Sequence, residues 1–462
     1  GIWSPGDTLK FTAILSHGKV EDNGTLLPQS GYSVLNAEQQ LDADIETTAA
    51  EFRAEGNFGE SLDWMVGGNL SEDKGFENHK LFIDTNSALY PVAGTNPVSN
   101  FVGTFGEFDS TQTAGFVNLN WYIVDSLKLD VGVRYTRDVR DFTGCSYEPL
   151  DAEGTGLTAT FNLIKLSQGG LPTMEKGDCV TLDGSGGNDQ FESTLAEENI
   201  SGRAAISFTP NDNLLLYSSF SVGFKSGGFP VLSSSSQDQY EAVEQEELLA
   251  LEFGAKQTLL DGALQLNSSV FYYDYRDKQL LTRLRDDVFG PLPVLKNAPR
   301  SNVKGVELEV TATPLDGLLF KASGSFIKTE IEEFMSTGFD GSPQDFSGNP
   351  FNFSPELEYT LLVDYSRFIG ENFLAGIGVD YSYTDESNST LDQNPQFRQD
   401  SYGLMNVRVR LEDANETWKA SVYSNNVSNE FSTVSIIQAG DGAARFAGRP
   451  NIVGVSFSYN WF

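Results

Sequence analysis

The chain has 462 residues and a formal net charge of −35, because 30 Lys and Arg stand against 65 Asp and Glu. This balance excludes a nucleic-acid binder, since phosphate backbones are bound through Lys and Arg. With 2 Cys and 2 His, the chain has little to offer a disulfide-dense scaffold, a zinc or haem site, or His-based catalysis. No run approaches about 18 consecutive apolar residues, which excludes a membrane-spanning helix.

Apolar residues alternate with polar or small residues along much of the chain. In order, the alternation is strict over residues 117–123, 127–135, 373–383, 405–411 and 453–461. A period of two residues predicts β-strands with one apolar and one hydrophilic face. Such strands form either a soluble sandwich, whose apolar faces meet, or a membrane barrel, whose apolar face meets lipid.

The lengths of the connections favour the barrel. Short connections rich in Asp, Asn, Gly and Pro alternate with long ones, near residues 75–111, 143–199 and 332–351. Tight turns at one end and wide loops at the other are typical of a transmembrane barrel. The sequence therefore predicts an all-β, antiparallel transmembrane β-barrel with about 16 visible strands. The strands are expected to begin near residues 8, 44, 62, 112, 127, 199, 214, 246, 263, 298, 317, 352, 373, 401, 418 and 453.

Aromatic residues support a membrane location. Several lie towards strand ends, where amphipathic rings favour the membrane–water interface. Ordinary cross-strand packing is the other explanation for any one of them. They are Trp64, Trp121, Tyr122, Tyr381, Tyr383, Trp418, Tyr459 and Trp461.

Five segments, in order, resemble motifs of TonB-dependent outer-membrane receptors. Ser219–Phe229 (SFSVGFKSGGF) is similar to a strand-and-loop signature of that family. Leu249–Lys256 followed by Val270–Gln279 resembles its E-x-G-x-K and F-x-x-D pattern, and Asn302–Glu309 (NVKGVELE) its N-x-x-G-x-E-x-E strand. Asn425–Phe431 (NNVSNEF) resembles the penultimate-strand motif, and the chain ends on an aromatic residue.

The resemblance implies a 22-stranded barrel around an amino-terminal plug. Residues 1–462 contain no recognisable plug or TonB box, so we expect one barrel domain, the carboxy-terminal part of a longer receptor without its plug and first strands. Both ends are then expected on the periplasmic side. Phe462 departs from the family, since Tyr459 and Trp461 hold the outward phase and Phe462 lies one residue beyond it.

The family's function implies uptake across the bacterial outer membrane of a scarce ligand, most often a ferric siderophore. Energy then comes from TonB acting on a plug that this chain does not contain. The implied partners are outer-membrane lipid, lipopolysaccharide and an iron chelate or other small ligand, with no nucleic acid and no cofactor. Uptake of an oligosaccharide or cobalamin, or a passive porin, is the alternative. An enzyme is not expected, because no Gly-x-Ser-x-Gly elbow occurs and only His17 and His79 could serve as bases.

Ligand contacts are expected high on the strands, on the lumen side. Arg can pair with anionic oxygens of a siderophore, although lumen charges usually pair with neighbouring acids. The glycines at 223, 227 and 228 fit either a flexible loop presenting aromatics or a strand end with close backbone approach, and the second reading is favoured. The candidates are Arg134, Arg137, Arg140, Phe224, Lys225, Phe229, Tyr273, Tyr275, Arg276 and Arg283.

Cys145 and Cys179 fall in one long loop that the resemblance places outside the cell. Oxidising conditions there permit a disulfide, which we predict. A metal site at this pair is less favoured, because no His or third Cys lies near. The acidic run 183–189 has the oxygen density of a calcium loop but has Thr194, not Glu, at the twelfth position, so no metal site is predicted.

Overall fold

The structure is a computed structural model that describes residues 1–6, 8–31, 34–83, 101–152, 156–338, 341–439 and 442–461. Its main feature is one antiparallel sheet of 19 strands. Three of these, β1, β13 and β14, have only two or three residues. The prediction about Phe462 lies outside the described residues.

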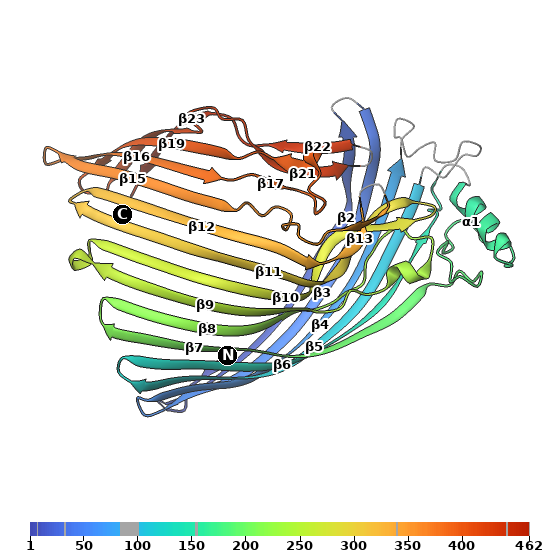
Figure 1. The fold of residues 1–462 in the computed structure, drawn as a ribbon, viewed down its shortest axis with the longest axis horizontal. Coiled ribbons are helices and arrows are strands. Elements are labelled where there is room, and N and C mark those ends of the chain that lie inside the picture. The colour runs from blue at the N-terminus through green and yellow to red at the C-terminus, as the bar shows by residue number, and fades with distance from the viewer. Residues whose placement is uncertain are drawn as a thin grey trace.

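The sixteen long strands follow one another in the sheet in chain order, each pairing antiparallel with the next (Figure 1). This confirms the predicted all-β meander. The elements are β1 (Ile2–Trp3), β2 (Leu9–Gly31), β3 (Val34–Phe58), β4 (Leu62–Ile83), β5 (Phe101–Val124), β6 (Leu127–Tyr147), α1 (Gly156–Ser167), β7 (Phe191–Asn211), β8 (Leu214–Lys225), η1 (Gln237–Tyr240), β9 (Glu246–Leu259), η2 (Leu260–Gly262), β10 (Leu264–Asp286), β11 (Gly290–Leu315), β12 (Leu318–Glu333), β13 (Met335–Thr337), β14 (Pro343–Asp345), β15 (Leu357–Ile369), β16 (Phe373–Thr384), β17 (Ser387–Asn388), η3 (Pro395–Phe397), β18 (Arg398–Gln399), β19 (Tyr402–Asp413), β20 (Trp418–Asn425), β21 (Thr433–Ala439), β22 (Gly442–Ala447) and β23 (Ile452–Tyr459).

The sheet curves into a wall but does not close on itself among the described residues. β23 pairs only with β20, and β2 pairs with β3 on one edge and with the two residues of β1 on the other. Tight turns gather at one end of the wall, and α1 lies at the other (Figure 1). Gly59 and Gly317, with φ of 66° and 79°, supply the left-handed backbone that two of these turns require.

The outer face of the wall is apolar where the strands leave the tight turns. Val117 pairs with Val133, and Leu119 with Val131, while Val117 and Val133 are 46% and 51% exposed. Exposed aliphatic side chains on one side of a paired sheet are what a lipid-facing surface requires. The opposite, inner face carries polar side chains at the alternating positions.

Aromatic side chains border this apolar surface on the outer face. Trp418 pairs in register with Tyr459 close to the tight turns, and Trp121 is 48% exposed. At the other end of the apolar band, Tyr359 stacks on Tyr383, with ring centroids 5.2 Å apart. These two levels fit the predicted interfacial aromatics.

The boundaries of two predicted loops are wrong. β4 continues to Ile83 and β5 begins at Phe101, so much of the expected loop at 75–111 is strand. Likewise β6 runs to Tyr147 and β7 begins at Phe191. Above the apolar band both faces of a strand are polar, so alternation ends although the backbone ladder continues.

No helix among the described residues has both the length and the apolar composition needed to cross a membrane. The single α-helix within the described ranges, α1, instead packs against the outer ends of the strands through Leu157 and Phe161.

A charge on the outer face should destabilise the wall. We expect Val117→Arg to lower the free energy of unfolding by about 2–4 kcal/mol, because the new cation replaces an aliphatic contact with lipid. Urea titration of the protein refolded in lipid vesicles, followed by tryptophan fluorescence, measures this.

Asn120→Arg is the matched control on the same strand. Asn120 pairs with Asp63 and Asp130 on the inner face, so the new cation meets acids and water there. Equal losses for the two variants would contradict the assignment of the faces.

Candidate functional site

The inner face is acidic and hollowed across the middle of the wall. A hollow of about 530 Å³ opens there between β8 and β16. Glu252, beside it on β9, accepts a hydrogen bond from the Tyr217 hydroxyl. Side chains that line the hollow include Tyr217, Lys256, Asn267, Glu307, Glu309 and Glu358.

Higher on the wall, the segment that follows β8 is tied to the inner face of β6 and β7. Asp138 accepts a hydrogen bond from the Ser226 hydroxyl at 2.9 Å, and Glu197 accepts one from the Gly227 amide at 2.8 Å. Arg140 donates to the Gly227 carbonyl at 2.6 Å. Arg140, one of the predicted ligand residues, therefore binds the backbone of the Ser219–Phe229 motif.

Close backbone packing explains a glycine in this segment. Gly228 and Val243 exchange backbone hydrogen bonds of 3.0 and 2.9 Å. A Cβ atom at Gly227 would overlap the Val243 carbonyl oxygen, whereas a Cβ atom at Gly223 would meet nothing within 4 Å. Close backbone approach thus accounts for Gly227, in line with the favoured reading of the motif.

Phe229 packs into an aromatic cluster under the same segment. Its ring stacks on Phe142 with centroids 4.9 Å apart, and Phe191 stacks on Tyr240 at 5.6 Å. Phe142 and Tyr240 are 3% and 0% exposed. Packing therefore holds Phe229 in a fixed orientation at the top of the inner wall.

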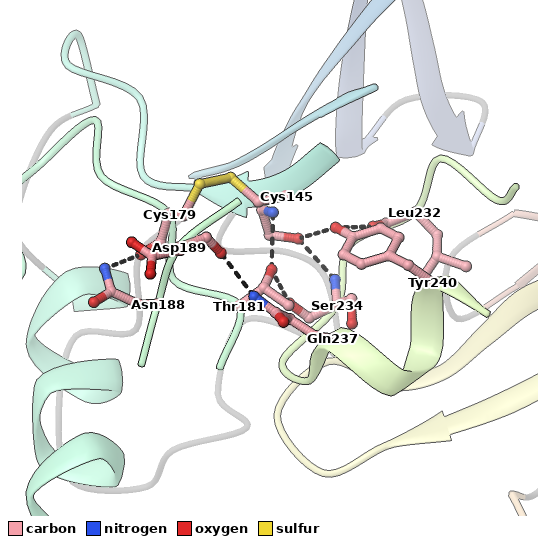
Figure 2. Close-up of a disulfide and its surroundings, with 10 residues drawn as sticks. Cys145, Cys179, Thr181, Asn188, Asp189, Leu232, Ser234, Gln237 and Tyr240 are labelled. Atoms are coloured by element: carbon pink, nitrogen blue, oxygen red, sulfur yellow. Dashed lines mark hydrogen bonds between the residues drawn. A yellow bond between two sulfur atoms is a disulfide. The ribbon is translucent and has the colours of Figure 1, made fainter. Parts of the chain in front are cut away.

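The predicted disulfide is confirmed. Cys145, near the end of β6, is bonded to Cys179, 34 residues further along, with Cα atoms 5.8 Å apart (Figure 2). Beside it, Asn188 donates to the Cys179 carbonyl at 2.9 Å and Gln237 to the Asp189 carbonyl at 2.7 Å. The loop that the disulfide closes is thereby joined to the loop between β8 and β9.

A buried hydroxyl network continues this junction (Figure 2). Thr181 accepts from the Ser146 amide and donates to the Ser234 carbonyl, both at 3.0 Å. Tyr240 donates to the Leu232 carbonyl at 3.1 Å. Burial raises the pKa of Tyr240 to about 12, so its hydroxyl stays protonated as a donor at neutral pH.

An apolar core completes the connection between loops. Phe161 of α1 is fully buried beside Val180, and Phe289 at the β10–β11 tip packs against this core. Asp286 accepts from the Ser235 amide at 2.8 Å. We call residues 156–190, 226–245 and 286–290 the loop cap, since these contacts join them into one folded unit above the wall.

The inner side of β10 presents two of the predicted tyrosines and a lysine that alternation does not predict there. Tyr273 stacks on Phe271 at 4.7 Å, and Lys278 lies with its ammonium 4.0 Å from the centre of the Tyr275 ring. Strict alternation puts Lys278 on the outer face with Tyr272. Asp277, however, has a φ of 49°, which reverses the phase of the strand.

The reversal has a local cause. Opposite Asp277 stands Pro299, which has no amide hydrogen for the ladder. The Asn297 side chain donates to the Asp277 carbonyl at 2.7 Å instead. A positive φ in the middle of a strand gives no signal in the pattern of apolar residues, which is why Lys278 was missed.

The other candidates divide between the faces. Arg134, on the inner face, donates to the Thr136 hydroxyl at 3.0 Å, and Lys225 pairs in register with Glu246. Arg283 lies high on β10, where it pairs with Thr337 of β13.

Three candidates lie on the outer face. Arg137 is 3.7 Å from Glu198, and Arg276 is 3.5 Å from Glu247, with both arginines more than half exposed. Phe224 pairs in register with the same Glu247. On their strands these residues lie an even number of positions from Tyr135, Tyr272 and Phe220, which face outward. The expectation that they face the lumen therefore does not hold.

No cluster of His, Cys, Asp or Glu suited to a metal ion occurs within the described ranges. Asp183, in the calcium-like run, accepts from the Ser185 hydroxyl and from the amides of Ser185 and Gly187, each at 2.8 Å. These hydrogen bonds lower the pKa of Asp183 and fold the run as a turn.

The wall, its two faces and its loops define an outer-membrane receptor barrel. Residues 2–429 match the family described as TonB dependent receptor-like, beta-barrel, and the chain belongs to this family. The family consists of receptors and transporters of the outer membrane of Gram-negative bacteria, not of enzymes.

Solved structures of similar fold are distant in sequence. The ferric yersiniabactin uptake receptor FyuA from Yersinia pestis superposes with a TM-score of 0.73 at 16% identity, over 100% of this chain and 60% of that one. The siderophore receptor PiuA from Acinetobacter baumannii gives 0.69 at 16%, over 99% and 62%. The ferric citrate transporter FecA gives 0.65 at 14%, over 99% and 60%. The chain thus spans about 60% of the length of these structures.

Opening the disulfide should loosen the loop cap. We expect Cys145→Ser with Cys179→Ser to lower the free energy of unfolding by about 3–4 kcal/mol, since the bridge restricts the unfolded chain. Urea titration and limited proteolysis within residues 156–190 measure this. Reductant should destabilise the wild type and leave the double variant unchanged; proteolysis that is equally slow in both would contradict the coupling.

A methyl group at Gly227 should detach the segment after β8. We expect Gly227→Ala to cost about 1–3 kcal/mol, because the added carbon overlaps the Val243 carbonyl. Gly223→Ala, in the same motif with free space around it, is the control. Hydrogen exchange of residues 226–245 should accelerate only in Gly227→Ala, and equal exchange in both variants would show that close approach is not required.

Proposed function

We propose that this chain is the wall of a receptor that takes up a ferric siderophore across the outer membrane, driven by TonB. The observation that carries the proposal is the family match over residues 2–429. The similar structures include a ferric yersiniabactin uptake receptor, a siderophore receptor and a ferric citrate transporter, which supports iron chelates as the ligand class.

The inner wall suits such a cargo chemically. A ferric chelate is too large and polar to cross lipid, and the inner face offers hydroxyls, carboxylates and aromatic rings along its height. The loop cap suits a receptor because its contacts hold Phe229 and the Gly227 segment in fixed positions at the top of the wall. Fixed groups lose less entropy when a ligand binds.

The wall by itself supplies contacts and a path, but not energy. In this proposal a plug from the family's usual domain order fills the wall, contacts TonB and carries the coupling to the inner-membrane proton gradient. Outer-membrane lipid and lipopolysaccharide are the further partners of the wall, the latter through bridging cations.

Uptake in the source bacterium tests the proposal. We expect deletion of the gene to abolish accumulation of radioactive iron from at least one ferric siderophore under iron limitation. Inactivating TonB should have the same effect, because the transport is energised.

Three controls separate the alternatives. A passive porin predicts that accumulation survives loss of TonB and that the purified protein conducts ions in a planar bilayer. An oligosaccharide or cobalamin receptor predicts loss of those tracers with iron uptake unchanged. Any of these results would overturn the proposal.

A further inference from the structure

We propose that Lys278, assisted by Lys225, is the specificity-determining contact for an anionic oxygen of the ligand. This inference rests on the proposed function and deepens it, since it selects negatively charged ferric chelates over neutral ones.

Lys278 is a largely buried cation held by one long ion pair among the described residues. Its side chain is 17% exposed, and its ammonium lies 4.0 Å from the Tyr275 ring centre and 4.9 Å from that of Phe351. Across the described part of the chain, its closest contact with an acid is Glu246 at 3.7 Å, beyond hydrogen-bond distance. An ammonium has three donors to satisfy, so this one is prepared for a further acceptor.

Glu246 is poorly placed to supply that acceptor. Its second oxygen, Oε2, accepts from the Gln279 amide at 2.8 Å, which fixes the carboxylate towards β10. Ring faces attract the ammonium but offer no lone pair for a strong hydrogen bond.

Lys225 adds a second lysine beside this position. It is exposed, and it pairs in register with Glu246 from the other side, on β8. Two lysines thus flank Glu246, within a chain whose formal net charge is −35. An anionic ligand entering an acidic lumen therefore meets a cationic position here, beside two aromatic rings.

The lysine pair lies above the apolar band, where a ligand arrives. On the outer face at this height, the exposed apolar series of Val270 and Tyr272 gives way to Asp274 and Arg276. Phe351, which flanks the ammonium, belongs to the connection between β14 and β15. A ligand bound at Lys278 would therefore contact both β10 and the connection that contains Phe351.

Binding to the purified protein in detergent tests the proposal, with fluorescence quenching as the readout. The probes are a ferric tris-catecholate and ferric citrate, both anionic, and a neutral ferric tris-hydroxamate. We expect Lys278→Met to weaken binding of the anionic probe that binds the wild type by about 10- to 100-fold, the range for a lost charge-assisted hydrogen bond. Lys225→Met should weaken it less, and Lys278→Arg should retain most of the affinity.

Lys321→Met is the matched control, since it removes the same charge from an exposed position of β12 near the tight turns, outside the hollow. It should leave binding unchanged, and the unfolding midpoint of Lys278→Met should stay close to that of this control. Unchanged affinity in Lys278→Met, or an equal loss for anionic and neutral probes, would overturn the inference. So would wild-type binding of the neutral probe alone. Failure of the wild type to bind any ferric chelate would instead overturn the proposed function, and this inference with it.

Discussion

The structure depends on the need to satisfy every backbone N–H and C=O group where lipid excludes water. A continuous antiparallel ladder meets that need, and successive side chains must then point to opposite sides. Val117 and Val133 lie together on the lipid side for this reason, while Asn120 and Asp130 lie together on the other. The polar inner face, and every ligand contact proposed on it, follows from this arrangement.

The sequence predicted most of the wall, because lipid imposes a strict pattern on residues that cross it. Tight turns at Gly59 and Gly317 were identified from turn residues, and the starts of β4, β6 and β16 from alternation. The disulfide followed from two cysteines in one loop. Strand ends above the lipid, such as Phe101, were not predictable, since water on both faces removes the pattern.

The candidate site was predicted less well, because it depends on contacts between distant loops. Phe161 and Phe289 are separated by more than a hundred residues and pack in one core, and no local pattern indicates that pairing. Arg276 and Lys278 show a second difficulty. A prediction from spacing alone puts both on one face, but the backbone at Asp277 separates them.

The left-handed residue at Asp277 has a consequence for how such a protein diversifies. Below it, β10 is constrained by the thickness of hydrocarbon, and a substitution there is judged by its fit to acyl chains. Above Asp277, the hydrocarbon no longer constrains the strand. There the inward-facing side chains belong to the opposite phase of the alternation, beginning with Lys278. One residue thus changes which side chains of β10 face the lumen above the lipid without altering those that face the lipid below.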